Sequence, residues 1–326
     1  MGLSWIKMAF YSFRYQVLSF HPPYVRGLIN YRLSCCINAL LQSFNVTTEL
    51  VELLNKWHPS DEVEQTNVPG QLKRALYAIR DPSNPSPHKD FLNCLHDHSI
   101  SRLDVHDADE IFHTILNLTQ KQMADKDMAQ EIRKLFEIKV ETRVMCKACT
   151  YIQKVPNSLF SLPLAIRKGE NDLKSCIHSF SQEQTLKDDD ECYCDRCSEK
   201  QPSTHQLRLV SLPGVLCVHL KRFRIYDGFT RKLENKVTFP DTLQEDIFDA
   251  GLLENAEYYS LYAVIVHIGS ALCGHYTAYI RPNQDWYYAD DSDVRKVSWS
   301  DVQCTYQGYK TAYLLLYRKM SRSASE

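Results

Sequence analysis

The spacing of apolar residues in this chain changes near Phe136, and this change restricts the folds that the chain can adopt. Over 35–56 and 107–138, and more briefly near 70–80, apolar residues recur every three or four positions, as along one face of a helix. Beyond Phe136, short β-rich runs with alternating apolar residues are typical of strands. These runs cover 138–144, 207–220, 236–239, 259–269, 275–281 and 311–317. Helices followed by antiparallel strands predict an α+β fold.

The length and charge of the chain exclude several classes of protein. Its 326 residues, 44% of them hydrophobic, are enough to bury a substantial core. The net charge is −2 with both signs mixed, so neither nucleic acid nor a membrane surface is expected as a general partner. No apolar run approaches the roughly 20 residues that cross a bilayer, and no signal peptide is recognisable, so we expect no membrane insertion.

The twelve cysteines of the chain bear on its compartment. Many cysteines indicate disulfides in a small secreted domain, but this chain is neither small nor visibly secreted. We therefore expect a cytoplasmic or nuclear protein whose cysteines are free thiols, metal ligands or a nucleophile. Several are expected to be small buried hydrophobic residues, namely Cys36, Cys94, Cys176, Cys217 and Cys304.

Cys35 differs from these cysteines because it stands where the helix over 35–56 is predicted to begin. Ser34, immediately before it, is of a residue type that favours a helix N-cap. Unpaired backbone N–H groups and the helix dipole at such a position stabilise a thiolate. Cys35 is therefore a candidate nucleophile, although a lone cysteine at a helix start is common.

A histidine and two carboxylates near the other end of the chain have the spacing of a β-hairpin. His275 opens a predicted strand, and Asp290 and Asp291 follow after a short turn. A hairpin would place His275 and Asp290 on neighbouring strands, where a carboxylate can orient an imidazole that acts as a base. By itself, a surface histidine beside an acidic turn is the more common arrangement. His267 is a weaker candidate base because no acidic residue stands at a similar spacing.

Two C-x-x-C pairs, Cys146 with Cys149 and Cys194 with Cys197, predict a metal site. Four thiolates suit tetrahedral zinc, and because they leave no open position the zinc would be structural, with no catalytic metal. The 44 residues between the pairs exceed the spacing of a compact zinc ribbon, but they suit two metal-binding turns joined through a longer hairpin. A redox C-x-x-C is the alternative, and the doubled motif argues against it.

Motifs spread over residues 27–317 resemble, in the same order, those of the ubiquitin-specific protease family of papain-like cysteine proteases. The matching segments are the cysteine box at 27–42, then 107–112, 212–216, 220–223, 237–240, the histidine box at 262–291 and a closing strand at 312–317. The resemblance implies a helical thumb, zinc-bearing fingers and an antiparallel-sheet palm. The implied boundaries are one catalytic domain at 25–320 (thumb 25–137, fingers 138–206, mainly palm 207–320), an extension at 1–24 and a tail at 321–326.

The resemblance also implies roles for individual residues. Cys35 would be the nucleophile, His275 its base and Asp290 the residue that orients the base. Asn30 would donate, with the Cys35 backbone N–H, to the oxyanion of the tetrahedral intermediate. The four cysteines of the C-x-x-C pairs fall where the family's fingers bind zinc. The residues expected to bind the C-terminal tail of the modifier are Asp107, Gly274, Tyr276 and Asp291.

Within the family, the doubled Cys35–Cys36 and the segment 297–306 resemble small interferon-induced members that remove an interferon-stimulated ubiquitin-like modifier. The implied activity is that of an isopeptidase that releases the modifier's C-terminal glycine from a substrate lysine. The implied regulatory role is to damp type I interferon signalling by binding a receptor subunit and a signalling adaptor.

Three positions depart from the family's cysteine box. Arg32 stands where the family usually carries glycine, so the loop that presents Asn30 is expected to differ or to be strained. Cys36 replaces a usual tyrosine. With Leu33, Arg32 also motivates an alternative function, a binding module that occupies a modifier or receptor complex with little or no turnover. A zinc-bearing redox protein is a further alternative.

Overall fold

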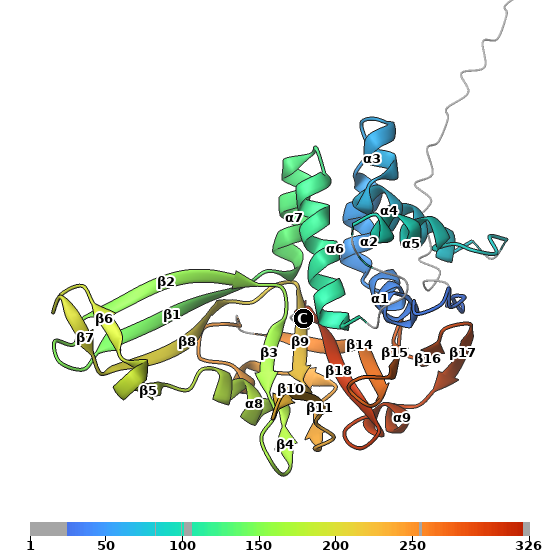
Figure 1. Cartoon of the computed structure of the whole chain (residues 1–326). Helices are drawn as coiled ribbons and strands as arrows, with labels where there is room; N and C mark the ends of the chain where they lie inside the picture. Colours follow the sequence, from blue (N-terminus) through green and yellow to red (C-terminus); the bar gives the residue numbers. More distant parts are fainter. Residues whose placement is uncertain (1–24, 82, 99, 101–105, 254–255, 322–326) are drawn as a thin grey trace, which may run out of the picture.

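The computed structural model describes residues 25–81, 83–98, 100, 106–253 and 256–321 (Figure 1). The predicted extension at 1–24 and residues 322–326 of the predicted tail lie outside the described residues. The helices are α1 (Cys35–Asn45), α2 (Thr48–Lys56), α3 (Glu62–Thr66), α4 (Val68–Ile79), α5 (Lys89–His96), α6 (Ala108–Gln122), α7 (Lys126–Phe136), α8 (Leu173–Phe180) and α9 (Trp299–Gln303), with short 3-10 turns η1 (Asp188–Asp190) and η2 (Glu245–Ile247).

The strands fall almost entirely after the helices of the first third of the chain, which agrees with the predicted α+β order. They are β1 (Ile138–Cys146), β2 (Ile152–Leu159), β3 (Leu162–Ala165), β4 (Asn171–Asp172), β5 (Gln184–Leu186), β6 (Cys192–Cys194), β7 (Glu199–Gln201), β8 (Ser203–Ser211), β9 (Val215–Lys221), β10 (Phe223–Tyr226), β11 (Phe229–Lys232), β12 (Val237–Thr238), β13 (Thr242–Leu243), β14 (Glu257–Gly269), β15 (Gly274–Ile280), β16 (Trp286–Asp290), β17 (Asp293–Val297) and β18 (Lys310–Ser321).

A large sheet occupies the centre of the molecule. Its strands lie in the order β17-β16-β15-β14-β18-β9-β3, and β13 pairs with β14. Along β14, Ala263 and Ile265 belong to one hydrophobic core, whereas Val264 and Val266 belong to another. Because successive side chains of a strand point to opposite faces, the sheet is buried on both sides. This double burial explains why β14 is apolar at consecutive positions rather than alternating with polar residues.

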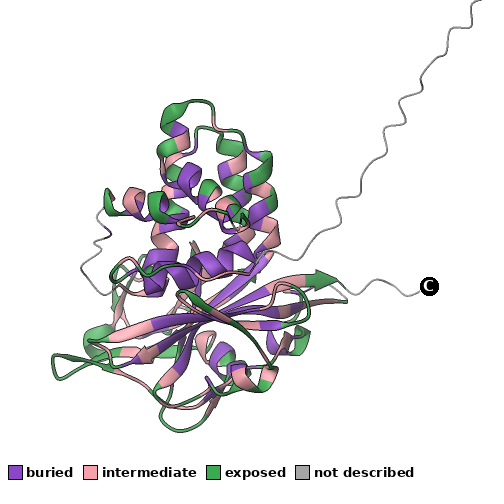
Figure 2. Ribbon diagram, turned by 90° about the vertical axis from the view of Figure 1, so that its right-hand side faces the viewer, coloured by how far each residue is buried: buried purple, intermediate pink, exposed green. Residues whose placement is uncertain are grey.

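The helical subdomain formed by α1 to α7 lies on one face of this sheet (Figure 2), and α1 and α7 contact its strands directly. Phe44 of α1, Phe112 of α6 and Phe136 of α7 meet in pairs whose ring centroids lie 5.6 to 6.4 Å apart. Such aromatic contacts add to the stability gained from burying the rings. They join three helices into the predicted helical subdomain, and α1 in turn contacts β15.

Two segments predicted as single helices each contain a break. The segment 35–56 forms α1 and α2, which are separated at Val46 and Thr47. The buried Thr47 hydroxyl lies 2.8 Å from the Tyr262 hydroxyl and donates to the Ser43 carbonyl, so the chain turns where this residue meets the sheet. The segment 107–138 forms α6 and α7, and Asp125 caps the second helix.

The fingers are a second sheet with the strand order β2-β1-β8-β5, which extends from the body as a long arm (Figure 1). The predicted strand over 207–220 is two strands, because Pro213 and Gly214 separate β8 in this arm from β9 in the central sheet. Strand β3 lies within the predicted finger range 138–206 but pairs with β9. None of the helices in the described part of the chain is both long and apolar enough to cross a membrane.

Candidate active site

Cys35 is the first residue of α1, as the sequence predicts, and its side chain is largely buried. Ser34 precedes the helix, but its hydroxyl does not cap it. The Ser34 hydroxyl instead accepts from the Tyr31 backbone N–H at 2.9 Å and lies 3.3 Å from Oδ1 of Asn30. Burial raises the pKa of the neighbouring Cys36 thiol well above its usual value, so Cys36 stays neutral. Of the two adjacent cysteines, only Cys35 is placed to react with the histidine described next.

The structure brings His275 against both Cys35 and Asp290. His275 lies on β15 and Asp290 on the adjacent strand β16, and Nε2 of the imidazole is 2.6 Å from Oδ1 of the carboxylate. The Cys35 side chain lies on the other side of the same imidazole, close enough to raise its pKa. Because Nε2 is occupied by Asp290, Nδ1 is the nitrogen left to interact with the thiol. The interactions with Cys35 and then with Asp290 raise the pKa of His275 to about 9, against an opposing effect of burial.

Asp291 connects the residues around the nucleophile. Its carboxylate accepts hydrogen bonds from Nδ2 of Asn30 at 2.8 Å and from Nδ2 of Asn38 at 2.7 Å. Its backbone carbonyl accepts from Leu28 N–H at 2.7 Å. One hydrogen of the Asn30 amide is thus used by Asp291, and the second remains for another acceptor. Asn38 was not among the predicted site residues, although it lies three positions after Cys35 and hence on the same side of α1.

Asp107 has two structural roles. It caps α6 by accepting from the backbone N–H groups of Asp109 at 2.8 Å and Glu110 at 3.2 Å. Its other carboxylate oxygen accepts a hydrogen bond from the Tyr313 hydroxyl on β18. Asp107 therefore joins the helical subdomain to the central sheet, and its predicted contact with a modifier tail remains a prediction.

Gly274 is a glycine because His267 fills the space beside it. A Cβ atom at Gly274 would lie 2.0 Å from Nε2 of His267. His267 is buried between the rings of Phe223 and Tyr276, with ring centroids 5.0 and 4.9 Å away. Burial lowers the pKa of His267 to about 4, so it is neutral at physiological pH. Within the described residues, no ion pair joins His267 to a carboxylate, in contrast to His275.

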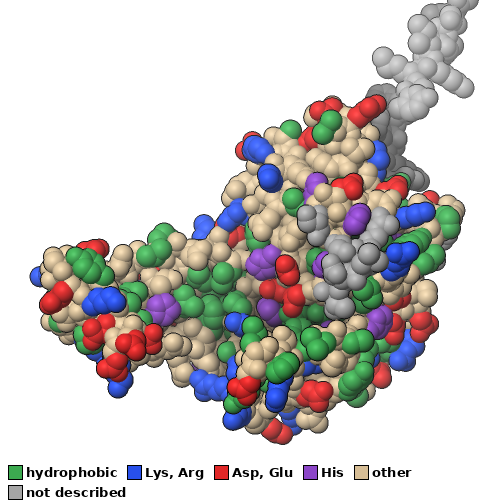
Figure 3. All heavy atoms as spheres, viewed as in Figure 1, with side chains coloured by type: hydrophobic (Ala, Val, Ile, Leu, Met, Phe, Trp, Pro, Cys, Tyr) green, Lys and Arg blue, Asp and Glu red, His purple; other side chains and the backbone are tan. Residues whose placement is uncertain are grey.

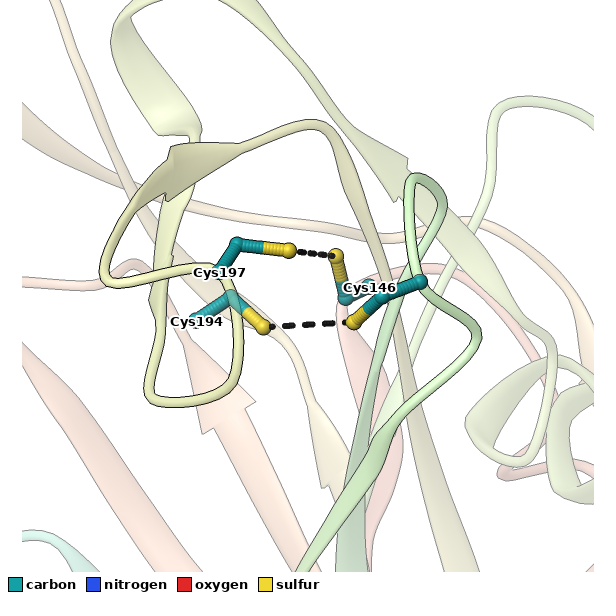
Figure 4. Close-up of side chains that lie close together, drawn as sticks. Cys146, Cys194 and Cys197 are labelled. Atoms are coloured by element: carbon teal, nitrogen blue, oxygen red, sulfur yellow. Dashed lines mark hydrogen bonds between the residues drawn. The ribbon is translucent and has the colours of Figure 1, made fainter.

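The four cysteines of the C-x-x-C pairs meet at the tip of the fingers (Figure 4). Cys146 and Cys149 lie at the turn between β1 and β2, and Cys194 and Cys197 on the hairpin of β6 and β7. Their sulfur atoms all lie within 4.8 Å of one another, with Cys146 to Cys197 at 3.9 Å and Cys149 to Cys194 at 3.6 Å. Sulfurs at the corners of a tetrahedron around zinc are separated by about 3.8 Å. The set therefore fits a structural zinc site.

The remaining cysteines differ in exposure. Cys36, Cys176 and Cys217 are buried, as expected of small hydrophobic residues. The same expectation is wrong for Cys304, which is exposed after α9, and only partly right for Cys94, which is half-buried. The difference arises because the last turn of a short surface helix such as α9 has one side in solvent.

A polar cluster between the helices and the central sheet was not predicted. Oδ2 of Asp109 lies 3.0 Å from Nδ1 of His219 on β9, and His113 lies 2.9 Å from the Ser161 hydroxyl. Burial alone would raise the pKa of Asp109, but the combined interactions with His219, Ser161 and His113 outweigh it and lower the pKa. Figure 3 shows histidine and acidic side chains gathered where the helices meet the fingers. No local pattern identifies this cluster, since its members come from three distant segments.

A cysteine, a histidine and an aspartate that meet where a helical subdomain packs on an antiparallel sheet define a papain-like thiol peptidase. A family model described as ubiquitin carboxyl-terminal hydrolase matches residues 26–317, and the chain belongs to this family. The chain is therefore a cysteine-type, deubiquitinase-like peptidase, which confirms the predicted family and enzyme class.

Two curated relatives and one solved structure extend this result. The chain is 34% identical over 316 residues to Ubl carboxyl-terminal hydrolase 18 of Mus musculus, a match covering 90% of this chain and 85% of the relative. It is 30% identical over 323 residues to the Homo sapiens protein of the same name, covering 92% and 86%. The structure of the SAGA Ubp8/Sgf11/Sus1/Sgf73 DUB module bound to ubiquitin aldehyde matches with a TM-score of 0.78 and 22% identity, over 92% of this chain and 70% of that chain. This match confirms the predicted fold.

Proposed function

We propose that this protein is a thiol isopeptidase that hydrolyses the bond between the C-terminal glycine of a ubiquitin-like modifier and a substrate lysine. One observation carries the proposal. The His275 imidazole is hydrogen-bonded to Asp290 and interacts with the Cys35 thiol, which is the arrangement that a thiol nucleophile requires. The thumb, palm and fingers around these residues are the scaffold of the family to which the chain belongs.

In the proposed mechanism, Cys35 and His275 form a thiolate–imidazolium pair. The thiolate attacks the carbonyl carbon of the modifier's terminal glycine, and the negative charge moves to the carbonyl oxygen. When the intermediate collapses, His275 gives its proton to the departing lysine amine and a thioester remains on Cys35. His275 then takes a proton from water, which hydrolyses the thioester and restores the thiolate. Asp290 holds the imidazole in the required orientation throughout.

Asn30 is the proposed side-chain donor to the oxyanion. Its Nδ2 carries a second hydrogen besides the one given to Asp291, and the Cys35 backbone N–H is the proposed second donor. Asp291 would then act by orienting Asn30. Gly274, Tyr276 and Asp107 are proposed to line the path of the modifier's Gly-Gly tail.

The four finger cysteines are proposed to hold one structural zinc ion. Zinc would join the β1–β2 turn to the β6–β7 hairpin. Both are short elements at the end of a long arm, and the metal would hold them together. With four thiolate ligands it would supply no chemistry to the reaction, and no catalytic metal is proposed.

The modifier is proposed to be the interferon-stimulated one rather than ubiquitin. The similarity to relatives named Ubl carboxyl-terminal hydrolase 18 over most of both chains supports a ubiquitin-like substrate. We further propose that the protein acts in the cytoplasm and restrains type I interferon signalling, with a receptor subunit and a signalling adaptor as partners. This role follows from the family resemblance of the sequence.

A second candidate function is a binding module with little turnover. Arg32 has a φ of 64° and Leu33 is 41% exposed, both within three residues of Cys35. A loop of this kind could misplace Asn30 while leaving the modifier-binding surface intact.

Electrophilic probes built on the two modifiers test these proposals together. We expect intact-mass analysis to show one adduct, on Cys35, with the probe based on the interferon-stimulated modifier and little with the ubiquitin probe. Cys35→Ala should abolish the adduct, whereas Cys273→Ser, at an exposed cysteine, should retain it. Equal reaction of both probes would refute the substrate choice. Absence of any adduct would favour the binding module, and hydrolysis by Cys35→Ala would reject the proposed nucleophile.

A further inference from the structure

The loop 28–34, which carries Asn30 toward the nucleophile, contains an unfavourable backbone conformation. Arg32 lies at a φ of 64°, in the left-handed region that residues with a Cβ atom rarely adopt. Its side chain is exposed. Conformations of this kind persist only where the surrounding contacts impose them. The contacts that the loop makes with the surrounding segments therefore determine where Asn30 lies.

One set of contacts comes from the hairpin that carries the acidic residues. The Leu28 N–H donates to the Asp291 carbonyl at 2.7 Å, and Asn30 donates to the Asp291 carboxylate at 2.8 Å. At Gly27 the two segments approach so closely that a Cβ atom would lie 2.1 Å from the Ser292 carbonyl oxygen. This set holds the start of the loop and the Nδ2 group of the Asn30 side chain.

A second set comes from the segment between α4 and α5. The Tyr31 hydroxyl donates to Oγ of Ser86 at 2.6 Å, and Nε2 of His88 lies 3.1 Å from the Ile29 carbonyl oxygen. The rings of Tyr31 and His88 pack with centroids 5.5 Å apart. A carbonyl oxygen can only accept, so Nε2 of His88 carries the hydrogen. His88 is fully buried, and burial lowers its pKa to about 4, which keeps it a neutral donor.

The segment that provides this second set is itself held in place. The Ser86 N–H donates to Oδ1 of Asn84 at 3.0 Å. The two terminal nitrogens of Arg26 donate to the carbonyls of Asp81 and Asn84, each at 2.7 Å. Arg26 lies two residues before the loop 28–34 in the chain. The turn between α4 and α5 is therefore tied both to the start of the loop and to the residues on each side of Asn30.

We propose that Tyr31, Ser86 and His88 are positioning residues that hold Asn30 in place to donate to the oxyanion. Their contacts fix the neighbours of Asn30 on both sides, the Ile29 carbonyl and the Tyr31 side chain. A donor stabilises the transition state only when it is aimed in advance at the position where charge develops. The inference rests on the proposed function, since it requires that Asn30 act on the oxyanion.

Tyr31→Phe tests the inference because it removes only the hydroxyl and keeps the ring against His88. With a modifier fused to a fluorogenic leaving group, we expect kcat to fall about tenfold and KM to stay unchanged, since the oxyanion exists only during the reaction. Ser86→Ala should lower kcat to the same extent, whereas Ser86→Thr should keep the wild-type kcat because it keeps a hydroxyl. The kcat of the double variant Tyr31→Phe/Ser86→Ala should be no lower than that of either single variant. Tyr77→Phe, at a tyrosine 75% exposed, is the control and should match the wild type.

The Asn30→Ala background separates positioning from a general structural effect. If Tyr31 acts through Asn30, adding Tyr31→Phe to Asn30→Ala should lower kcat by less than twofold. An undiminished tenfold loss in that background, a rise in KM instead of a fall in kcat, or wild-type kcat in Tyr31→Phe would each overturn the inference. Thermal unfolding of every variant checks that the folded fraction is unchanged. Activity of Cys35→Ala would instead overturn the proposed function, so the two failures are distinguishable.

Discussion

Nε2 of His275 lies 2.6 Å from Oδ1 of Asp290, on the neighbouring strand of the hairpin formed by β15 and β16. This bond leaves the second imidazole nitrogen free for the Cys35 thiol, and the interactions with Cys35 and Asp290 raise the pKa of His275 to about 9. An imidazole with a raised pKa keeps its proton at neutral pH. His275 is thus suited to protonate a departing amine, in addition to forming an ion pair with a thiolate.

The raised pKa of His275 predicts how activity depends on pH. Because the imidazolium is the proton donor, kcat/KM should decline as pH rises through about 9, where His275 loses its proton. In Asp290→Asn this decline should begin at lower pH, since the carboxylate no longer stabilises the imidazolium. Asp293→Asn removes the same charge from an exposed position on the next strand and should leave the profile in place. A decline at the same pH in wild type and Asp290→Asn would contradict this role.

The backbone of Arg32 predicts that glycine is favoured at this position. A residue with a Cβ atom in the left-handed region is strained by about 1 kcal/mol relative to glycine. We expect Arg32→Gly to raise the free energy of unfolding by up to about that amount, measured by urea denaturation. Arg32→Ala keeps the Cβ atom and should give no such gain. If both variants were stabilised equally, the cause would lie in the arginine side chain and not in the backbone.

The cluster of finger cysteines predicts a bound metal that stabilises the arm. Metal analysis of the purified protein should find one zinc ion per chain, and Cys149→Ser should lose it and become more susceptible to proteolysis between β5 and β8. Cys192 lies on the same hairpin but outside the cluster, so Cys192→Ser is the matched control and should keep its zinc. Unchanged zinc content in Cys149→Ser would show that the metal binds elsewhere.

The close approach of His267 to Gly274 predicts a packing requirement beside the catalytic histidine. A methyl group at Gly274 would overlap the imidazole, so Gly274→Ala should destabilise the protein by about 1–3 kcal/mol. Gly214→Ala, where a Cβ atom would lie 3.2 Å from a Leu135 side-chain atom, is a milder control. The cost of Gly274→Ala should shrink when His267→Ala is also present, because the nearest atom to the added methyl group is then the Ile268 carbonyl oxygen, at 3.0 Å. An undiminished cost would mean that another contact requires the glycine.

Local sequence patterns predict the elements of this fold better than their junctions. The spacing of apolar residues indicates helices over 35–56 and 107–138 correctly, but it does not show that each contains a break. At the break, the Thr47 hydroxyl contacts the hydroxyl of Tyr262, more than 200 residues away. Pro213 and Gly214 do interrupt the predicted strand over 207–220, so this division between the arm and the central sheet has a local signal.

The sequence by itself determined the α+β class, the family, and the residue types of the candidate site, because periodicity and motif spacing are local properties of the chain. Only the tertiary structure decided which distant groups meet. Asp291 accepts hydrogen bonds from Asn30 and Asn38. Asp109 pairs with His219, and the Tyr31 hydroxyl donates to Ser86. A side chain's partner across tens or hundreds of residues is set by how helices and strands pack, and a short-range pattern carries no information about that choice.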